Sequence, residues 1–216
     1  SRKELVHSQF LAWLLKLNSS HGMGMYPMIK FLQLISAAAS FKINNTAYID
    51  KVLADRFIIE NYTIDSEPRV RTEVSTGEIS EKGKKEQRRI DILITVSINL
   101  GDGVERILPI IIENKVYSKE HTDQTEAYYK WALERYGKGR KSIFPVFVFL
   151  TPQVQDIRPC KCEKYIVITY QNLLDYVLEP CMNYPGTEVG KIMLHNYLRC
   201  LTISDIFSED DNMGRG

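Results

Sequence analysis

Apolar residues near the start of the chain recur with the spacing of an amphipathic helix. Residues 4–17 read ELVHSQFLAWLLKL, and turn residues follow at 18–22. Three leucines in the second half of this segment fall on one side, because residues three and four apart share a helix face. We predict a first helix over 4–17 and a second over 27–40. For residues 47–59 the pattern favours a short helix followed by a strand.

The period of the apolar residues then changes from that of a helix to that of a strand. Isoleucine or valine stands at every even position from 90 to 98, and Asp91 lies on the opposite face. Side chains alternate between the two faces of a strand, so this pattern indicates a strand. A Gly-Asp-Gly turn at 101–103 predicts a hairpin. The expected elements of this part are strands at 69–75, 89–99 and 107–116, with a polar loop at 76–85.

The second half of the chain alternates again between helices and strands. The apolar run at 142–150 is typical of a strand buried on both faces. We expect a helix at 120–136, strands at 142–150 and 165–170, and helices at 171–178 and 191–203. This order predicts an α/β protein with a mixed sheet flanked by helices. The expected organisation is a single domain at 1–207, with its core at about 4–170, C-terminal helices at 171–207, and a polar tail at 208–216 that is a truncation point or the way into a further domain.

The composition agrees with one folded domain. Charge and apolar run length bear on whether the chain binds nucleic acid or a membrane. The chain has 216 residues, of which 44% are hydrophobic and 25% are charged, and its formal net charge is +1. Many nucleic-acid binders have a strong basic excess, which is absent here, but residues 82–89 form a local basic run. No apolar run reaches the roughly 20 residues of a membrane-spanning helix, and the start has no signal-peptide pattern. We therefore expect a cytoplasmic protein with no membrane partner.

Two carboxylates face each other across the predicted hairpin. If the turn is symmetric about Asp102, residues whose numbers add to 204 are paired, and Asp91 then lies opposite Glu113. Like charges in that position destabilise a sheet, so a shared divalent cation is the expected reason for them. The other interpretation is a structural network in which the two acids pair with Lys115 or Arg89.

A glutamate and a lysine end the returning strand on one face. Glu113 and Lys115 are two residues apart and follow the apolar run 108–112, where charges must be bound to something. Mg²⁺ or Mn²⁺ held by Asp91, Glu113 and the backbone carbonyl of Asn114 would polarise a phosphate and lower the pKa of a bound water. Lys115 would orient that water and stabilise the transition state as a point charge. This set suits phosphodiester cleavage.

Two helices are expected to complete the site. Glu4 shares a core-facing helical stripe with Ser8, and it is either a further ligand or a capping or surface acid near the start of its helix. Gln124 and Tyr128 are four residues apart and share a face of the next helix. They either steady Lys115 and touch the nucleic-acid backbone or serve only in packing.

The basic run is the expected contact with nucleic acid outside this centre. Lys84, Lys85 and Arg88 would meet phosphates, although a solvated loop fits the same residues. His7 and His21 are expected to be structural histidines rather than ligands.

The spacing of these residues resembles a known family. Asp91, followed by Glu113-Asn114-Lys115 a strand later, resembles the signature of the PD-(D/E)XK nuclease superfamily, and Gln124-x-x-x-Tyr128 resembles its RecB-type branch. The opening segment ELVHSQFLAWLL, with the later His-Gly pair at 21–22, is similar to a bacterial group of uncharacterised PD-(D/E)XK proteins. The resemblance covers roughly residues 4–170.

The chain also departs from this family in two places. Ile90 stands where the superfamily name has proline. Cys160-x-Cys162 matches neither a zinc pattern nor the cysteine cluster of the iron–sulfur variants, so free thiols and no cluster are expected.

The resemblance implies a restriction-endonuclease-like core of αβββαβ order and Mg²⁺- or Mn²⁺-dependent cleavage of DNA. It implies Asp91 and Glu113 as metal ligands, Lys115 as the catalytic lysine and Glu4 as the acid of the first helix. The alternative function is a catalytically silent nuclease fold that binds nucleic acid or a protein partner, and RNA is an alternative substrate. Cutting both strands of a duplex would favour a homodimer.

Overall fold

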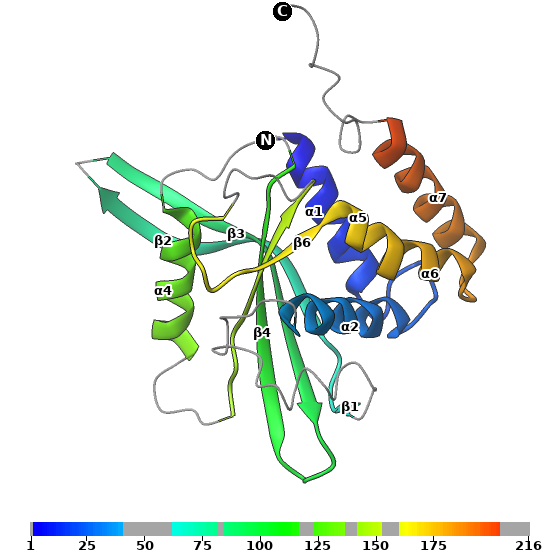
Figure 1. Ribbon diagram of the computed structural model, residues 1–216, viewed down its shortest axis with the longest axis horizontal. Helices are drawn as coiled ribbons and strands as arrows, with labels where there is room; N and C mark the ends of the chain where they lie inside the picture. Colours follow the sequence, from blue (N-terminus) through cyan, green and yellow to red (C-terminus); the bar gives the residue numbers. More distant parts are fainter. Residues whose placement is uncertain are drawn as a thin grey trace, which may run out of the picture.

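The computed structural model describes residues 2–40, 62–81, 84–116, 123–136, 142–152 and 160–203. Helices precede a six-stranded sheet, and further helices follow its last strand (Figure 1). The predictions for residues 47–59 and for the tail at 208–216 lie outside the described residues.

The helices and strands follow the predicted order. The helices are α1 (Arg2–Leu15), α2 (Tyr26–Ser40), α4 (Gln124–Tyr136), α5 (Tyr170–Leu173), α6 (Glu179–Asn183) and α7 (Glu188–Ile203), with a π-helical turn η1 (Leu174–Leu178) between α5 and α6. The strands are β1 (Thr63–Ile64), β2 (Arg69–Glu81), β3 (Lys84–Asn99), β4 (Glu105–Asn114), β5 (Val146–Thr151) and β6 (Ile166–Thr169). Most ends differ from the predicted ones by a few residues, as expected where an ending depends on tertiary contacts.

The sheet combines antiparallel and parallel pairs. Its strand order is β1-β3-β4-β5-β6, and β2 also pairs with β3. β2, β3 and β4 pair antiparallel, whereas β4, β5 and β6 pair parallel. The parallel connection from β4 to β5 passes through α4, because parallel strands need a crossover. The predicted αβββαβ order and the mixed α/β sheet flanked by helices are therefore confirmed.

Two hydrophobic clusters cover the two faces of the sheet. The larger cluster packs helices α1 and α2 on one face and includes Phe31 and Ile94. The smaller cluster packs α4 on the other face and includes Leu93 and Tyr128. Figure 1 shows α4 on one side of the strands and α1 with α2 on the other. In the described part of the chain, no helix is long and apolar enough to span a membrane.

The hairpin of β2 and β3 is longer than predicted. The prediction of a polar loop at 76–85 is wrong, because β2 continues to Glu81 and β3 begins at Lys84. The ladder resumes at Glu78↔Gln87 after a register shift between Ser75 and Glu78. A hairpin that is polar on both faces carries no apolar alternation, so its strands leave no period in the sequence. Figure 1 shows this end of the hairpin reaching beyond the rest of the sheet.

Strand β3 changes the face of its apolar side chains at Asp91. Ile92 packs in the larger cluster, but Ile90 packs in the smaller one with Leu93. The prediction that every even position from 90 to 98 shares one face is therefore wrong at Ile90. In the neighbouring strand Glu73 has φ of 52°, a conformation that interrupts a regular pleat. Asp91 thus lies where the strand passes from one layer of the core to the other.

Candidate active site

The register of the β3–β4 hairpin brings the two predicted carboxylates together. Pairing runs from Asn99↔Glu105 to Ile92↔Ile112, which confirms the register predicted from the symmetric turn. The ladder ends at Ile92↔Ile112, and the same register continued by one residue would set Asp91 opposite Glu113. A hydrogen bond from the backbone N–H of Asn114 to Asp91 Oδ2, at 2.7 Å, ties the strands together at this point.

Glu113 and Lys115 form a buried ion pair at the end of β4. Lys115 Nζ lies 2.8 Å from Glu113 Oε1, and the two side chains are 10% and 0% exposed. Alternation along the strand places both on one face, as predicted. Burying a lone charge is costly, so each of these side chains depends on the other when no further ligand is bound.

Asp91 is held in a setting that disfavours its charge. Burial, with smaller contributions from the charges of Glu73 and Glu4, outweighs the lowering effects of the Asn114 hydrogen bond and of Lys115 and raises the pKa of this carboxyl to about 6. A cation placed beside such an acid would relieve the repulsion and restore the ionised form.

Lys115 keeps its charge despite being largely buried. Burial alone would lower its pKa, but Glu113, then Asp91 and Glu4, outweigh burial, so its pKa lies above the usual value. The side chain is therefore an ammonium donor at neutral pH and acts as a fixed positive charge rather than as a base.

Helix α1 brings its first turn to the end of β4. Glu4 is 6% exposed, which excludes the interpretation as a surface acid. The backbone carbonyl of Glu4 accepts a 3.5 Å hydrogen bond from Asn114 Nδ2, and the carboxylate charge acts on both Asp91 and Lys115. Glu4 thus belongs to the same acidic cluster as the two facing carboxylates.

Helix α4 contributes the predicted glutamine and tyrosine. Gln124 Nε2 donates to the hydroxyl of Tyr128 at 2.8 Å, and that hydroxyl donates to the carbonyl of Arg89 at 2.5 Å. Burial, followed by the charge of Glu113, raises the pKa of Tyr128 far above its usual value. The pair therefore fastens α4 to β3 two residues before Asp91 and lies within the electrostatic reach of Glu113.

The structure describes only part of the basic run. Lys84 and Lys85 lie in β3, not in a loop, and their side chains fall outside the described residues. Arg88 is half-buried and forms no ion pair in the described part of the chain. Its neighbour Arg89 lies 3.7 Å from Glu73.

A buried hydrogen-bond network behind Asn114 has no counterpart in the sequence-based predictions. The Asn114 side chain donates to Ser8 Oγ at 3.1 Å and accepts from the hydroxyl of Tyr170 at 2.9 Å. Tyr170 is also hydrogen-bonded to Tyr197, which bonds His7 Nδ1 at 2.8 Å. The network joins α1, β4, α5 and α7, and it fixes the residue whose carbonyl was predicted as a ligand. The one sequence signal was Ser8 on the core-facing stripe of Glu4.

The remaining histidine and cysteine predictions agree with the structure. His21 is fully buried and is hydrogen-bonded to the carbonyl of Lys16 and the N–H of Met23, which is a structural role. Cys160 and Cys162 form no disulfide within the described residues.

The residues at the end of β4 fit a hard divalent cation. Asp91, Glu113 and the Asn114 carbonyl supply only oxygen donors, which Mg²⁺ prefers. Within the described residues no group of three His, Cys, Asp or Glu side chains could hold a metal ion. Two carboxylates and a peptide carbonyl do not require such a group, and the raised pKa of Asp91 is the cost that a bound cation would remove.

Comparison with known proteins agrees with this geometry. No curated protein and no solved structure matches the chain. A family model described as the PD-(D/E)XK nuclease superfamily matches residues 1–199. That range contains the hairpin, both flanking helices and the network behind Asn114. Because the match covers most of the 216 residues, the chain belongs to the PD-(D/E)XK nuclease superfamily.

Proposed function

We propose that the protein is a nuclease that hydrolyses phosphodiester bonds in DNA with Mg²⁺ or Mn²⁺ as cofactor. The superfamily generally hydrolyses phosphodiester bonds. The observation that carries the proposal is the convergence of the half-buried Asp91, the buried Glu113 and the largely buried Lys115 at the end of β4. A protein gains nothing in stability by gathering charges in this way, so a ligand is the physical reason for them.

Asp91, Glu113 and the carbonyl of Asn114 would hold the cation. When bound, the cation supplies a Lewis acid beside the phosphate and lowers the pKa of a water. Asp91 then stays ionised, and Glu113 shares its charge between the cation and Lys115. Glu4, buried in the first turn of α1 with its backbone carbonyl against the Asn114 side chain, would add a carboxylate ligand directly or through a water.

The ammonium group of Lys115 would orient the attacking water and stabilise the negative charge that develops at the phosphate. Its protonated state at neutral pH suits the stabilisation of negative charge. Gln124 and Tyr128 hold the backbone of β3 beside Asp91, and their spacing is that of the RecB-type branch, in which we place the chain. On this proposal they steady the position of Lys115 or touch the nucleic-acid backbone.

Calorimetric titration with Mg²⁺ and Mn²⁺ tests the metal site. We expect binding by the natural chain and its loss in the double variant Asp91→Asn/Glu113→Gln. Glu134→Gln, an exposed acid of α4, is the matched control and should bind as the natural chain does. Cleavage of DNA and RNA by the same proteins, and by Lys115→Ala, then tests the reaction. Lys115→Ala should bind metal but cleave at least a hundredfold more slowly, since a removed charge-stabilising group costs about that much or more.

The Glu113–Lys115 ion pair favours one alternative, a nuclease fold without catalysis. In that case the pair is a structural network and the chain binds nucleic acid or a protein partner without cutting. Nucleic-acid binding with no heat of metal binding, with or without an oligonucleotide, would establish this alternative and overturn the proposal.

A further inference from the structure

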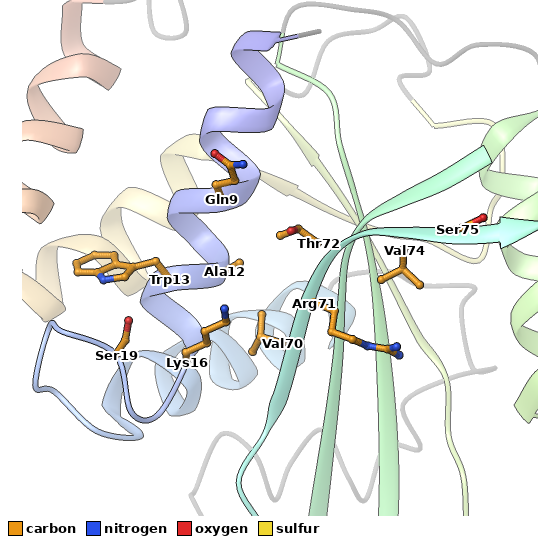
Figure 2. A pocket seen from close by; sticks show the side chains of 10 residues that line it. All are labelled: Gln9, Ala12, Trp13, Lys16, Ser19, Val70, Arg71, Thr72, Val74 and Ser75. Atoms are coloured by element: carbon orange, nitrogen blue, oxygen red, sulfur yellow. The ribbon is translucent and has the colours of Figure 1, made fainter. Parts of the chain in front are cut away.

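A groove runs between α1 and the edge strand β2, next to the candidate site. Its volume is about 640 Å³, and it is lined by Gln9 and Lys16 from α1 and by Thr72 and Ser75 from β2. Figure 2 shows Lys16 extending from α1 toward β2, with Thr72 turned toward α1. A second hollow shares Lys16 with the first and continues it along β2. The two hollows form one continuous groove, called the α1–β2 groove below.

The α1–β2 groove is positively charged. Lys16, Arg69 and Arg71 line it, and all three side chains are exposed. None of the three forms an ion pair within the described ranges of the chain. The acid among the lining residues, Glu67, accepts a 3.0 Å hydrogen bond from Asn18. The groove therefore presents three cations against one acid, on a chain whose formal net charge is only +1.

The groove ends beside the carboxylates. Thr72 pairs with Ile92 and Val74 with Ile90, so the groove residues of β2 flank the position opposite Asp91. The site itself is acidic and would repel phosphates other than the one bound at a cation. A polyanion that reaches the site therefore needs positive charge close by, and the α1–β2 groove supplies it on one side.

The cations are spaced for a chain of phosphates. Arg69 and Arg71 are two residues apart on β2, so they project from the same face about 6.6–6.8 Å apart, which is comparable to the separation of successive phosphates in an extended strand. Figure 2 shows Arg71 on the side of β2 away from α1, while Lys16 approaches from the helix. All three cations nevertheless line the hollow that continues along β2.

We propose that the α1–β2 groove binds the phosphate backbone of the nucleic-acid strand on one side of the cleaved bond, with Lys16, Arg69 and Arg71 as the phosphate contacts. This inference rests on the proposed nuclease function and adds a path for the strand. Phosphate contacts position a nucleic acid without reading its bases, so the groove contributes affinity for any sequence.

Fluorescence anisotropy with labelled oligonucleotides tests the groove, in EDTA so that no strand is cut. Affinity is measured at several salt concentrations for the natural chain and for the double variant Lys16→Ala/Arg71→Ala. Each lost phosphate contact should reduce the slope of log affinity against log salt by about one, and the reduction should be the same for unrelated sequences. Circular dichroism confirms that these exposed substitutions leave the fold intact.

Two matched variants show where the strand does not run. Lys130→Ala removes an exposed cation of α4, on the other side of the sheet, and Arg199→Ala removes one from α7. Both should keep the natural salt slope. An unchanged slope in Lys16→Ala/Arg71→Ala, or a reduced slope in Lys130→Ala alone, would overturn the inference.

Cleavage in Mg²⁺ separates this inference from the proposed function. If the natural chain cuts nucleic acid and the groove variants keep its affinity and salt slope, the enzyme stands and the groove assignment fails. If the groove variants raise KM at unchanged kcat, the groove assignment is supported. A natural chain that neither binds nor cuts overturns both proposals.

Discussion

At the scale of single residues, Asp91 is a proposed cation ligand that lowers the stability of the fold when no cation is bound. Its pKa of about 6 lies above the value of about 3.9 for an exposed aspartate, so the folded state holds the proton more tightly than the unfolded state. Its contribution to stability is then fully present below about pH 4 and is lost as the pH rises through about 6. When no cation is bound, the ionised carboxylate that would hold it therefore lowers the stability of the fold.

We therefore expect Asp91→Asn to stabilise the metal-free protein at high pH. Asparagine still accepts the hydrogen bond from Asn114 N–H but carries no charge to bury. Urea unfolding in EDTA should give a gain in the free energy of unfolding on the order of 2 kcal/mol at pH 8 and less than half of that at pH 4.5.

Asp102 at the turn of the same hairpin is the control. A side-chain hydrogen bond from Arg106 holds the pKa of this exposed carboxyl well below its usual range, so Asp102→Asn should lose stability above pH 4, not gain it. A stability change in Asp91→Asn that is the same at both pH values would contradict the assignment of a buried, repelled charge.

At the scale of secondary-structure elements, the hairpin was predictable because its chemistry and its turn are local. The symmetric turn fixed the pairing of β3 with β4, and therefore the meeting of Asp91 and Glu113. The predicted strand at 69–75 is shorter than β2, because the outer half of β2 is polar on both faces and has no apolar period. The change of face at Ile90 lies beside the positive φ of Glu73 in the neighbouring strand, and no pattern within β3 records either feature.

The network behind Asn114 shows why other parts of the site could not be predicted from the sequence. Asn114 is 106 residues from Ser8 and 56 from Tyr170, and His7 is 190 from Tyr197. Contacts over such separations depend on how α1, α5 and α7 pack around the end of β4. Neither tyrosine stands in a motif, so the packing alone reveals their connection to the site.

We predict that Tyr170→Phe weakens metal binding without touching a ligand. The change removes the hydroxyl that donates to Asn114 Oδ1, and the carbonyl of Asn114 then loses part of its fixed orientation. Loss of such a supporting hydrogen bond typically costs tenfold or more in metal affinity, so we expect the Kd for Mg²⁺ measured by calorimetry to rise by about tenfold.

The same substitution at Tyr176, which is 59% exposed on η1, is the matched control and should leave the Kd unchanged. Tyr170→Phe also leaves a buried amide oxygen with one partner fewer, so its stability is measured in parallel. If stability falls while the Kd for Mg²⁺ stays at the natural value, Tyr170 serves the fold alone.

At the scale of the whole molecule, the site lies where every layer of the fold meets. Helix α1 supplies Glu4, the hairpin supplies Asp91, Glu113 and Lys115, and α4 fastens the hairpin from the other face. A ligand that binds this junction contacts elements that lie far apart in the sequence. Its binding energy therefore adds to the stability of the domain as a whole and not only to that of one loop.

Metal binding should consequently raise the melting temperature of the entire chain. With a Kd on the order of 1 mM, 10 mM Mg²⁺ would stabilise the fold by about 1.4 kcal/mol, which corresponds to roughly 3–6 °C for a domain of this size. The rise should be full at pH 8 and should shrink below pH 6, because Asp91 must then release a proton to bind the cation.

Thermal unfolding of the natural chain and of Asp91→Asn/Glu113→Gln in Mg²⁺ and in EDTA measures this coupling. The double variant should melt at one temperature in both buffers, whereas Glu134→Gln should show the natural rise. An equal rise in the double variant would place the stabilising cation elsewhere on the molecule. A rise that is independent of pH would show that Asp91 is not among its ligands, since a ligand with a pKa near 6 imposes that pH dependence on the binding.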